Sequence, residues 1–198
     1  TRMEDVCLHL KNKNYNVVSL NELAKIKSSG FGAEKRNAYF VFDDLRIENV
    51  YLDKRNMQAI SKYGYKANMA SISSGKYLIN ADQWFKIITA MRGSGWENIS
   101  HSYFHNIPYS EKNSCVLWAE LREILHASDI LNMNNNALCY SYSHGWETVH
   151  TLLRMAGFAL AISIGYPFNA PLSRNRYMMA RVNMADDSSW SYIEKFVC

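Results

Sequence analysis

The sequence predicts a single α/β domain that spans residues 1–198. Two observations predict it: apolar residues recur at helical spacing in six segments, and short runs of aromatic and aliphatic residues lie between those segments. Continuous apolar runs of this kind are typical of strands buried on both faces of a parallel sheet. Alternation of such strands with helices indicates α/β architecture. Hydrophobic residues make up 48% of the chain and charged residues 20%, which excludes a disordered protein.

Each expected helix is marked by an apolar stripe at i, i+3, i+4 and i+7 and, in most cases, by a glycine that ends it. Ser19 stands where an N-cap is expected, and Gly157 stands where a left-handed C-terminal cap is expected. The predicted helices are residues 3–10, 20–26, 52–63, 84–91, 117–131 and 149–156.

The predicted strands are residues 38–42, 65–72, 137–142, 158–164 and 177–184. In α/β domains, functional groups gather on the loops that follow the carboxyl ends of the strands. The residues directly after each predicted strand are therefore the first candidates for a site.

Composition excludes several classes of function. There are 22 Lys and Arg against 18 Asp and Glu, so the net charge is +4, too small an excess to indicate a nucleic-acid-binding protein. No run of about 18 apolar residues is present, so the sequence predicts no membrane span. It contains no Gly-rich phosphate loop and no GxSxG elbow, and its four cysteines form no CxxC pair.

Two clusters carry chemistry that suits a metal-dependent hydrolase. Asp43 and Asp44 follow the first long strand, and His101 and His105 have the i, i+4 spacing that places two imidazoles on one helical face. Two His and one Asp leave an open position for water in a catalytic site, while the second Asp serves as a base. The alternatives are a carboxylate pair that caps the next helix and an ordinary pair of histidines.

A third cluster follows the strand that begins at residue 137. Its Tyr140 and Trp146 are candidates to stack on a sugar ring, and His144 is a weaker candidate for substrate binding. The alternative is that these aromatic residues belong to the core.

With these residues in view, the chain resembles the polysaccharide deacetylases of carbohydrate esterase family four, which have the NodB-homology fold. The family's first motif ends a strand in Phe-Asp-Asp-Gly, and the chain has Phe42-Asp43-Asp44-Leu45. The second motif, His-Ser/Thr-x-x-His, matches residues 101–105, and residues 62–69 are similar to the family's second strand. The stretch Arg181-Val182-Asn183-Met184 is similar to the Arg-Ile-Asn-Val of the biofilm poly-N-acetylglucosamine deacetylases.

The resemblance implies a deformed (β/α) barrel with an incomplete strand complement and one divalent ion, Zn²⁺ first, with Co²⁺ or Ni²⁺ as alternatives. It makes Asp44, His101 and His105 the metal ligands and Asp43 the general base. Ser102 then orients the loop, and the backbone N–H of Tyr142 faces the developing oxyanion.

Three departures from the family pattern stand out. Leu45 replaces a Gly, and Cys139 occupies the position of the Arg that normally holds the base. Arg181 is the candidate substitute for that Arg, and its alternative is a surface Arg beside an edge strand. The family's general acid is a His, and neither His9 nor His144 matches its motif.

The resemblance therefore implies hydrolysis of N-acetyl groups on an aminosugar polymer such as poly-N-acetylglucosamine, chitin or peptidoglycan. A carbohydrate-binding protein that has lost catalysis and an esterase for O-acetyl groups are the two alternatives. A polymer substrate also implies a site of action outside the cytoplasm.

Overall fold

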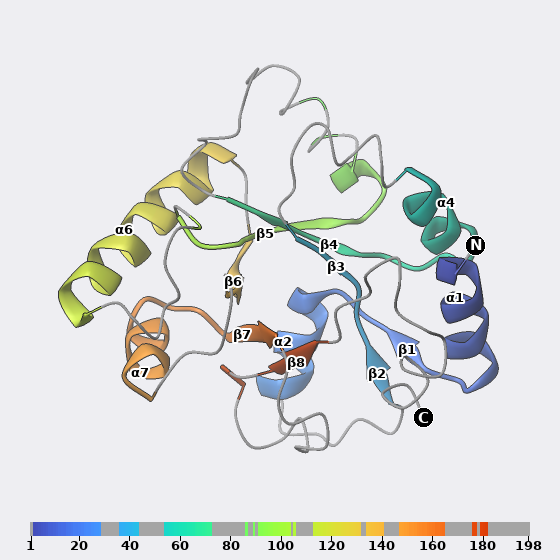
Figure 1. The fold of residues 1–198 in the computed structure, drawn as a ribbon, viewed down its shortest axis with the longest axis horizontal. Coiled ribbons are helices and arrows are strands. Elements are labelled where there is room, and N and C mark those ends of the chain that lie inside the picture. The colour runs from blue at the N-terminus through green and yellow to red at the C-terminus, as the bar shows by residue number, and fades with distance from the viewer. Residues whose placement is uncertain are drawn as a thin grey trace.

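The computed structural model describes residues 2–28, 36–43, 54–72, 86, 89, 91–103, 105, 113–131, 134–140, 147–164, 176–177 and 179–181. The α/β class predicted from the sequence is confirmed, because helices and strands alternate around a parallel sheet (Figure 1). The helices are α1 (Arg2–Asn12), α2 (Leu20–Ser28), α4 (Lys54–Lys62), α6 (Ser114–Leu131) and α7 (Glu147–Met155). The strands are β1 (Asn16–Val17), β2 (Asn37–Ala38), β3 (Val41–Phe42), β4 (Asn68–Ser71), β5 (Glu97–Ser100), β6 (Asn134–Cys139), β7 (Leu160–Ile164) and β8 (Met179–Arg181).

Six strands form one sheet in the order β3-β4-β5-β6-β7-β8, and β1 and β2 form a separate two-stranded sheet. All neighbouring pairs are parallel. Within the described segments β3 and β8 are not paired with each other, so the sheet curls without closing. This arrangement confirms the deformed barrel with an incomplete strand complement. It also brings the carboxyl ends of the strands to one edge.

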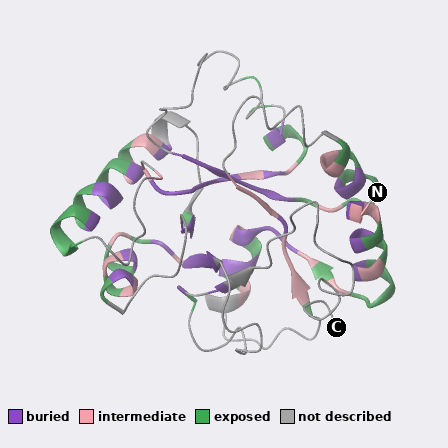
Figure 2. Cartoon of the chain, in the orientation of Figure 1, coloured by how far each residue is buried: buried purple, intermediate pink, exposed green. Residues whose placement is uncertain are grey.

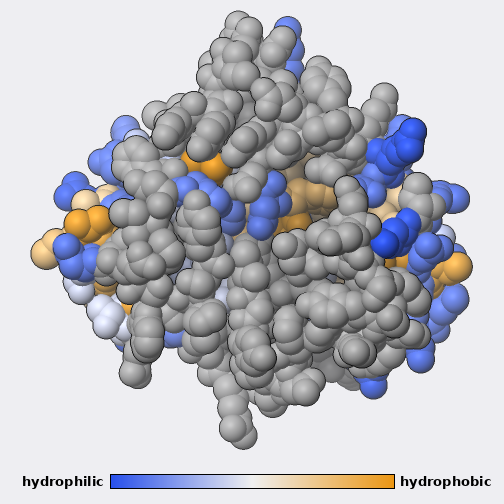
Figure 3. All heavy atoms as spheres, in the orientation of Figure 1, coloured by the Kyte–Doolittle hydropathy of each residue, from blue (hydrophilic) through white to orange (hydrophobic). Residues whose placement is uncertain are grey.

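The helices cover the two ends of the sheet and its inner face. α1 packs against α4 at one end, and α6 packs against α7 at the other (Figure 1). Figure 2 shows buried residues on the strands and exposed ones on the outward sides of these helices. Figure 3 shows mostly hydrophilic side chains over the helices at both ends, with a few hydrophobic ones among them. In the part of the chain that the structure describes, no helix has the length and apolar character needed to cross a bilayer.

α2 packs against the inner face of the sheet, and side-chain hydrogen bonds hold its first turn in place. Ser19 and Glu22 form a reciprocal capping pair: the Ser19 N–H donates to Glu22 Oε2 at 2.8 Å, and the Glu22 N–H donates to Ser19 Oγ at 3.2 Å. This confirms Ser19 as the N-cap. The fully buried Asn68 accepts a hydrogen bond from the Leu20 N–H at 3.0 Å and donates one to the Phe40 carbonyl at 2.9 Å. One side chain thus joins α2, β4 and the segment that leads into β3.

Alternate residues of each strand face two different cores, as the period of two requires. On β4, Met69 belongs to the cluster under α1 and α4, whereas Ala70 belongs to the inner cluster around α2. On β6, Leu138 belongs to the cluster under α6 and α7. The inner cluster consists of Val18, Leu20, Leu23, Ala24, Ala70, Ile99, Ala137, Cys139, Leu160, Ile162 and Met179.

The structure differs from the predicted elements in three places, the first of which is β1, a two-residue strand that was not predicted. β5 was not predicted, because Glu97, Asn98 and Ser100 are polar and only Ile99 carries an apolar signal. Asn98 and Ser100 are nevertheless buried, since Asn98 Oδ1 accepts a short hydrogen bond of 2.5 Å from the Ser71 hydroxyl of the neighbouring strand. The predicted strand 38–42 is divided into β2, which pairs with β1, and β3, which pairs with β4. Most of the predicted helix 84–91 lies outside the described residues.

Candidate metal centre

Three chemically active side chains meet at the carboxyl edge of the sheet because each lies two residues after an inward-facing residue. Side chains two apart on a strand point to the same face. The three pairs are Val41 and Asp43, Ile99 and His101, and Ala137 and Cys139. Their strands, β3, β5 and β6, are parallel members of one sheet, so their last residues come together at its inner edge.

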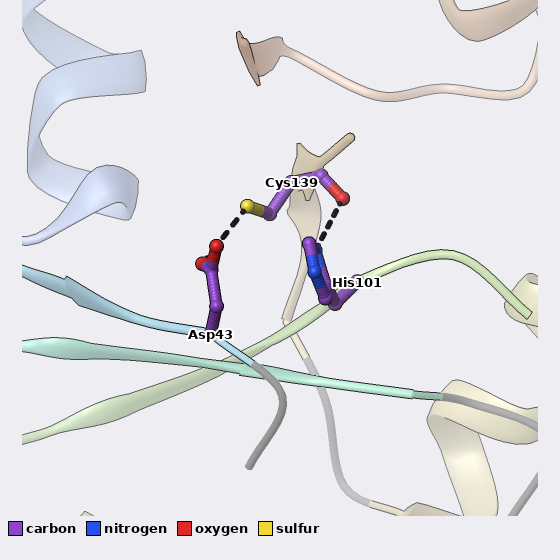
Figure 4. Close-up of side chains that lie close together, drawn as sticks. All are labelled: Asp43, His101 and Cys139. Atoms are coloured by element: carbon purple, nitrogen blue, oxygen red, sulfur yellow. Dashed lines mark hydrogen bonds between the residues drawn. The ribbon is translucent and has the colours of Figure 1, made fainter. Parts of the chain in front are cut away.

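Asp43, His101 and Cys139 offer ligand atoms that all lie within 4.8 Å of one another (Figure 4). The Cys139 thiol donates to Asp43 Oδ1 at 3.5 Å, and His101 Nδ1 lies 3.0 Å from the Cys139 carbonyl oxygen. A carbonyl oxygen can only accept, so Nδ1 carries the proton and Nε2 presents a lone pair. His101 and Cys139 are buried, whereas Asp43 is half-buried. An imidazole oriented in this way by a backbone carbonyl is typical of metal-ligating histidines.

The ring of His105 lies beside that of His101, and the two ring planes are tilted by 50°. Their Nε2 atoms are 3.1 Å apart, and the ring centroids are separated by 4.7 Å. Two imidazoles bound to one tetrahedral Zn²⁺ at about 2.0–2.1 Å place their nitrogens about 3.3 Å apart. The spacing therefore fits two ligands of a single ion, with Asp43 at the same edge of the sheet.

The loop after β5 holds the two histidines in a conformation that the sequence did not predict. The expected helical face is wrong, because residues 101–103 and 105 follow β5 without forming a helix. Ser102 and His105 both have positive φ, at 66° and 52°. For residues other than glycine this conformation costs on the order of 1–3 kcal/mol each, and it persists only where surrounding contacts impose it. Ser102 supplies one such contact, because its hydroxyl accepts the His105 N–H at 3.1 Å.

Several predicted site residues lie outside the described residues: Asp44, Tyr142, His144 and Trp146. Arg181 is described in its backbone, as the last residue of β8, where it pairs with Ile164. Their assigned roles remain predictions.

Tyr140 lies in the core. Its side chain is fully buried in the cluster under α6 and α7, together with Leu117 and Val149. Burial, with a smaller contribution from the charge of Tyr177, holds the pKa of the Tyr140 hydroxyl well above its usual range. This placement favours the alternative of a core aromatic over a sugar-binding one.

Cys139 belongs to the site, although it was not among the predicted site residues. Position 139 was identified only as the place where the family's Arg is missing. The signal that locates it is the alternation along β6, since Ala137 faces the inner cluster and Cys139 must face it too.

No family model and no curated protein sequence matches the chain. Solved structures do match it. A deacetylase of Streptococcus pyogenes, PplD in complex with acetate, superposes with a TM-score of 0.79 at 16% identity, over 98% of this chain and 85% of that one. A de-N-acetylase from Aggregatibacter actinomycetemcomitans gives 0.74 at 14% identity, over 96% and 86% of the two chains. IcaB from Ammonifex degensii gives 0.71 at 16%, over 99% and 88%.

At these identities the matches establish the fold. The chain has the architecture of the polysaccharide deacetylases over almost its whole length, as the resemblance of its motifs implied.

Proposed function

We propose that the chain is a metal-dependent hydrolase that removes N-acetyl groups from an aminosugar polymer and releases acetate. The observation that carries the proposal is the pair of Nε2 atoms 3.1 Å apart, beside a carboxylate, at the carboxyl edge of a parallel sheet. The deacetylases of the same fold support it, since one of them is described as a de-N-acetylase. Because such polymers belong to the cell surface or its surroundings, the proposal includes a site of action outside the cytoplasm.

His101 and His105 would hold the ion, and Asp44 completes the ligand set that the family resemblance implies. A bound divalent ion, with Zn²⁺ as the first candidate, supplies Lewis-acid polarisation of the acetyl carbonyl and lowers the pKa of the attacking water. The Cys139 carbonyl keeps the His101 ring in the tautomer that ligation needs.

Asp43 acts as the general base. It is half-buried, it lies at the same edge as the two imidazoles, and its Oδ1 accepts a hydrogen bond from the Cys139 thiol. The thiol orients the carboxylate from the position where the family has an Arg. Proton transfer from water to Asp43 accompanies attack on the acetyl carbon. A general acid then protonates the leaving nitrogen as the C–N bond breaks, which yields acetate and a free amine. The Tyr142 N–H would stabilise the oxyanion, and Arg181 is a second candidate to orient Asp43.

The first test is metal content, measured by elemental mass spectrometry for the wild type, His105→Ala and His126→Ala. His126 is an exposed histidine of α6, so its replacement controls for the loss of an imidazole elsewhere. We expect about one equivalent of a divalent ion in the wild type and the control and much less in His105→Ala. A wild type that takes up no ion, even after incubation with Zn²⁺, would contradict the proposed metal-dependent hydrolase. The remaining interpretation would then be a carbohydrate-binding protein.

The second test is acetate release from N-acetylated and O-acetylated polymers by the metal-loaded wild type and Asp43→Asn. Loss of the base should lower turnover by about 10²–10⁴-fold while the ion is retained. Near wild-type turnover of Asp43→Asn would show that Asp43 is not the base. Release from O-acetylated polymers alone would identify an esterase instead.

A further inference from the structure

Glu120 is a buried carboxylate on α6, away from the strand ends that form the metal centre. Its side chain is only 6% exposed, and charged groups are rarely buried to this extent without a partner. One partner is the backbone N–H of Tyr103, which donates to Glu120 Oε1 at 2.9 Å. Tyr103 lies between the two histidines, so a helix contacts the centre of the metal-binding loop.

This loop needs external support because of its backbone conformation. Ser102 and His105 flank Tyr103, and both are held at positive φ, which non-glycine residues adopt only under constraint. The loop begins with the His101 N–H donating to the Ser71 carbonyl at 2.7 Å, which continues the strand pairing. The bond from the His105 N–H to Ser102 Oγ closes the loop on itself. Of these three bonds, the one to Glu120 anchors the loop's middle to a separate element.

A carboxylate is suited to this anchoring. A hydrogen bond from a backbone N–H to an ionised acceptor is roughly twice as strong as a neutral one. α6 also packs against β6, the strand whose Cys139 carbonyl orients His101. The position of Glu120 is therefore set by a helix that contacts both the strand whose carbonyl orients His101 and the loop between the two histidines.

We infer that Glu120 is a positioning residue for the metal centre: through the Tyr103 amide it fixes the loop in which the Nε2 atoms of His101 and His105 lie 3.1 Å apart. The inference rests on the proposed function, because it assigns Glu120 to the site that would hold the ion. In this role Glu120 acts through the Tyr103 amide and not as a ligand of the ion.

The test is Zn²⁺ affinity, measured by competition with a chromophoric chelator at a temperature well below unfolding. The proteins are the wild type, Glu120→Ala, Glu120→Gln and the control Glu123→Gln, which changes an exposed acid of the same helix. Glu120→Ala should weaken Zn²⁺ binding by about 10–100-fold, the usual effect of losing a partner that orients a ligand. Glu120→Gln keeps an oxygen acceptor and should recover most of that loss, and Glu123→Gln should match the wild type.

If Glu120→Ala fails to fold, Glu120→Met fills similar space without an oxygen acceptor and carries the same expectation. Wild-type affinity in a folded Ala or Met variant would overturn the inference and leave the proposed function intact. A wild type that binds Zn²⁺ but releases no acetate would overturn the proposed function, while the Glu120 comparison would still decide the inference. A wild type without Zn²⁺ affinity would overturn both.

Discussion

Cys139→Ala separates two roles for the thiol at the metal centre, as a partner of the base or as a ligand of the ion. The substitution removes one fully buried sulfur atom and the bond of 3.5 Å to Asp43 Oδ1. Burial of a group of this size contributes about 0.8 kcal/mol to stability. A thiol is a weak donor, so its bond to a carboxylate is worth less than about 1.5 kcal/mol, the lower limit for hydrogen bonds to charged groups.

The variant should therefore unfold with a free energy about 1–2 kcal/mol lower than that of the wild type. Its turnover should fall by less than about tenfold, because each 1.36 kcal/mol of the barrier corresponds to a factor of ten. Cys7→Ala is the matched control, since Cys7 is equally buried in a different cluster, under α1 and α4. It should lose similar stability and no turnover.

The assays are urea unfolding, acetate release at saturating Zn²⁺ and chelator competition for Zn²⁺. As the partner of Asp43, Cys139 should leave the Zn²⁺ affinity of the Ala variant nearly unchanged. A loss of affinity of more than about 100-fold would exceed even the effect of losing a residue that orients a ligand, and would show instead that the thiol is a direct ligand. A loss of turnover as large as that of Asp43→Asn would show that the bond from the Cys139 thiol to Asp43 is worth much more than about 1.5 kcal/mol.

Two further predictions concern stability and thiol reactivity. Asn68→Ala leaves the buried Leu20 N–H without its acceptor, so it should lower the free energy of unfolding by about 1–3 kcal/mol and the melting temperature by roughly 2–12 °C. The control Asn16→Ala changes an exposed residue and should cost less than about 0.5 kcal/mol; equal losses of stability in the two variants would contradict this account. Among the three cysteines that the structure describes, Cys115 should react with a thiol reagent first because it is exposed, and the buried Cys7 and Cys139 should react far more slowly. Burial raises the pKa of Cys7 to about 11, which keeps that thiol protonated below this pH. Rapid labelling of Cys7 by mass spectrometry would contradict its burial.

Much of the fold could be predicted from local patterns in the sequence. The α2 helix was located by its apolar stripe and by Ser19, and the structure places the capping pair at that residue. β5 could not be predicted in the same way, because the burial of Asn98 and Ser100 depends on hydrogen bonds with a neighbouring strand. Such bonds form only after the strands have paired, so no short sequence window contains the signal.

The site could be predicted only in part, because its geometry also depends on contacts between distant parts of the chain. Residue types and motif order identified Asp43, His101 and His105. In the structure the His101 side chain lies close to those of Asp43 and His105. The i, i+4 spacing of the two histidines predicted that they lie on one face of a helix, and this prediction was wrong. A loop with two positive φ angles achieves the pairing instead, and its conformation depends on contacts from elsewhere in the chain.

Position 139 contributes to the site through its backbone as well as through its side chain. The carbonyl of residue 139 orients His101, and any residue at this position can supply it. The side chain alone varies, and it faces an inner cluster in which Leu160 and Ile162 are fully buried. A guanidinium in this apolar interior would have to lose its water, at a cost that only a well-formed ion pair offsets. A thiol avoids that cost and still donates to Asp43, so the absence of an Arg at this position does not by itself argue against catalysis.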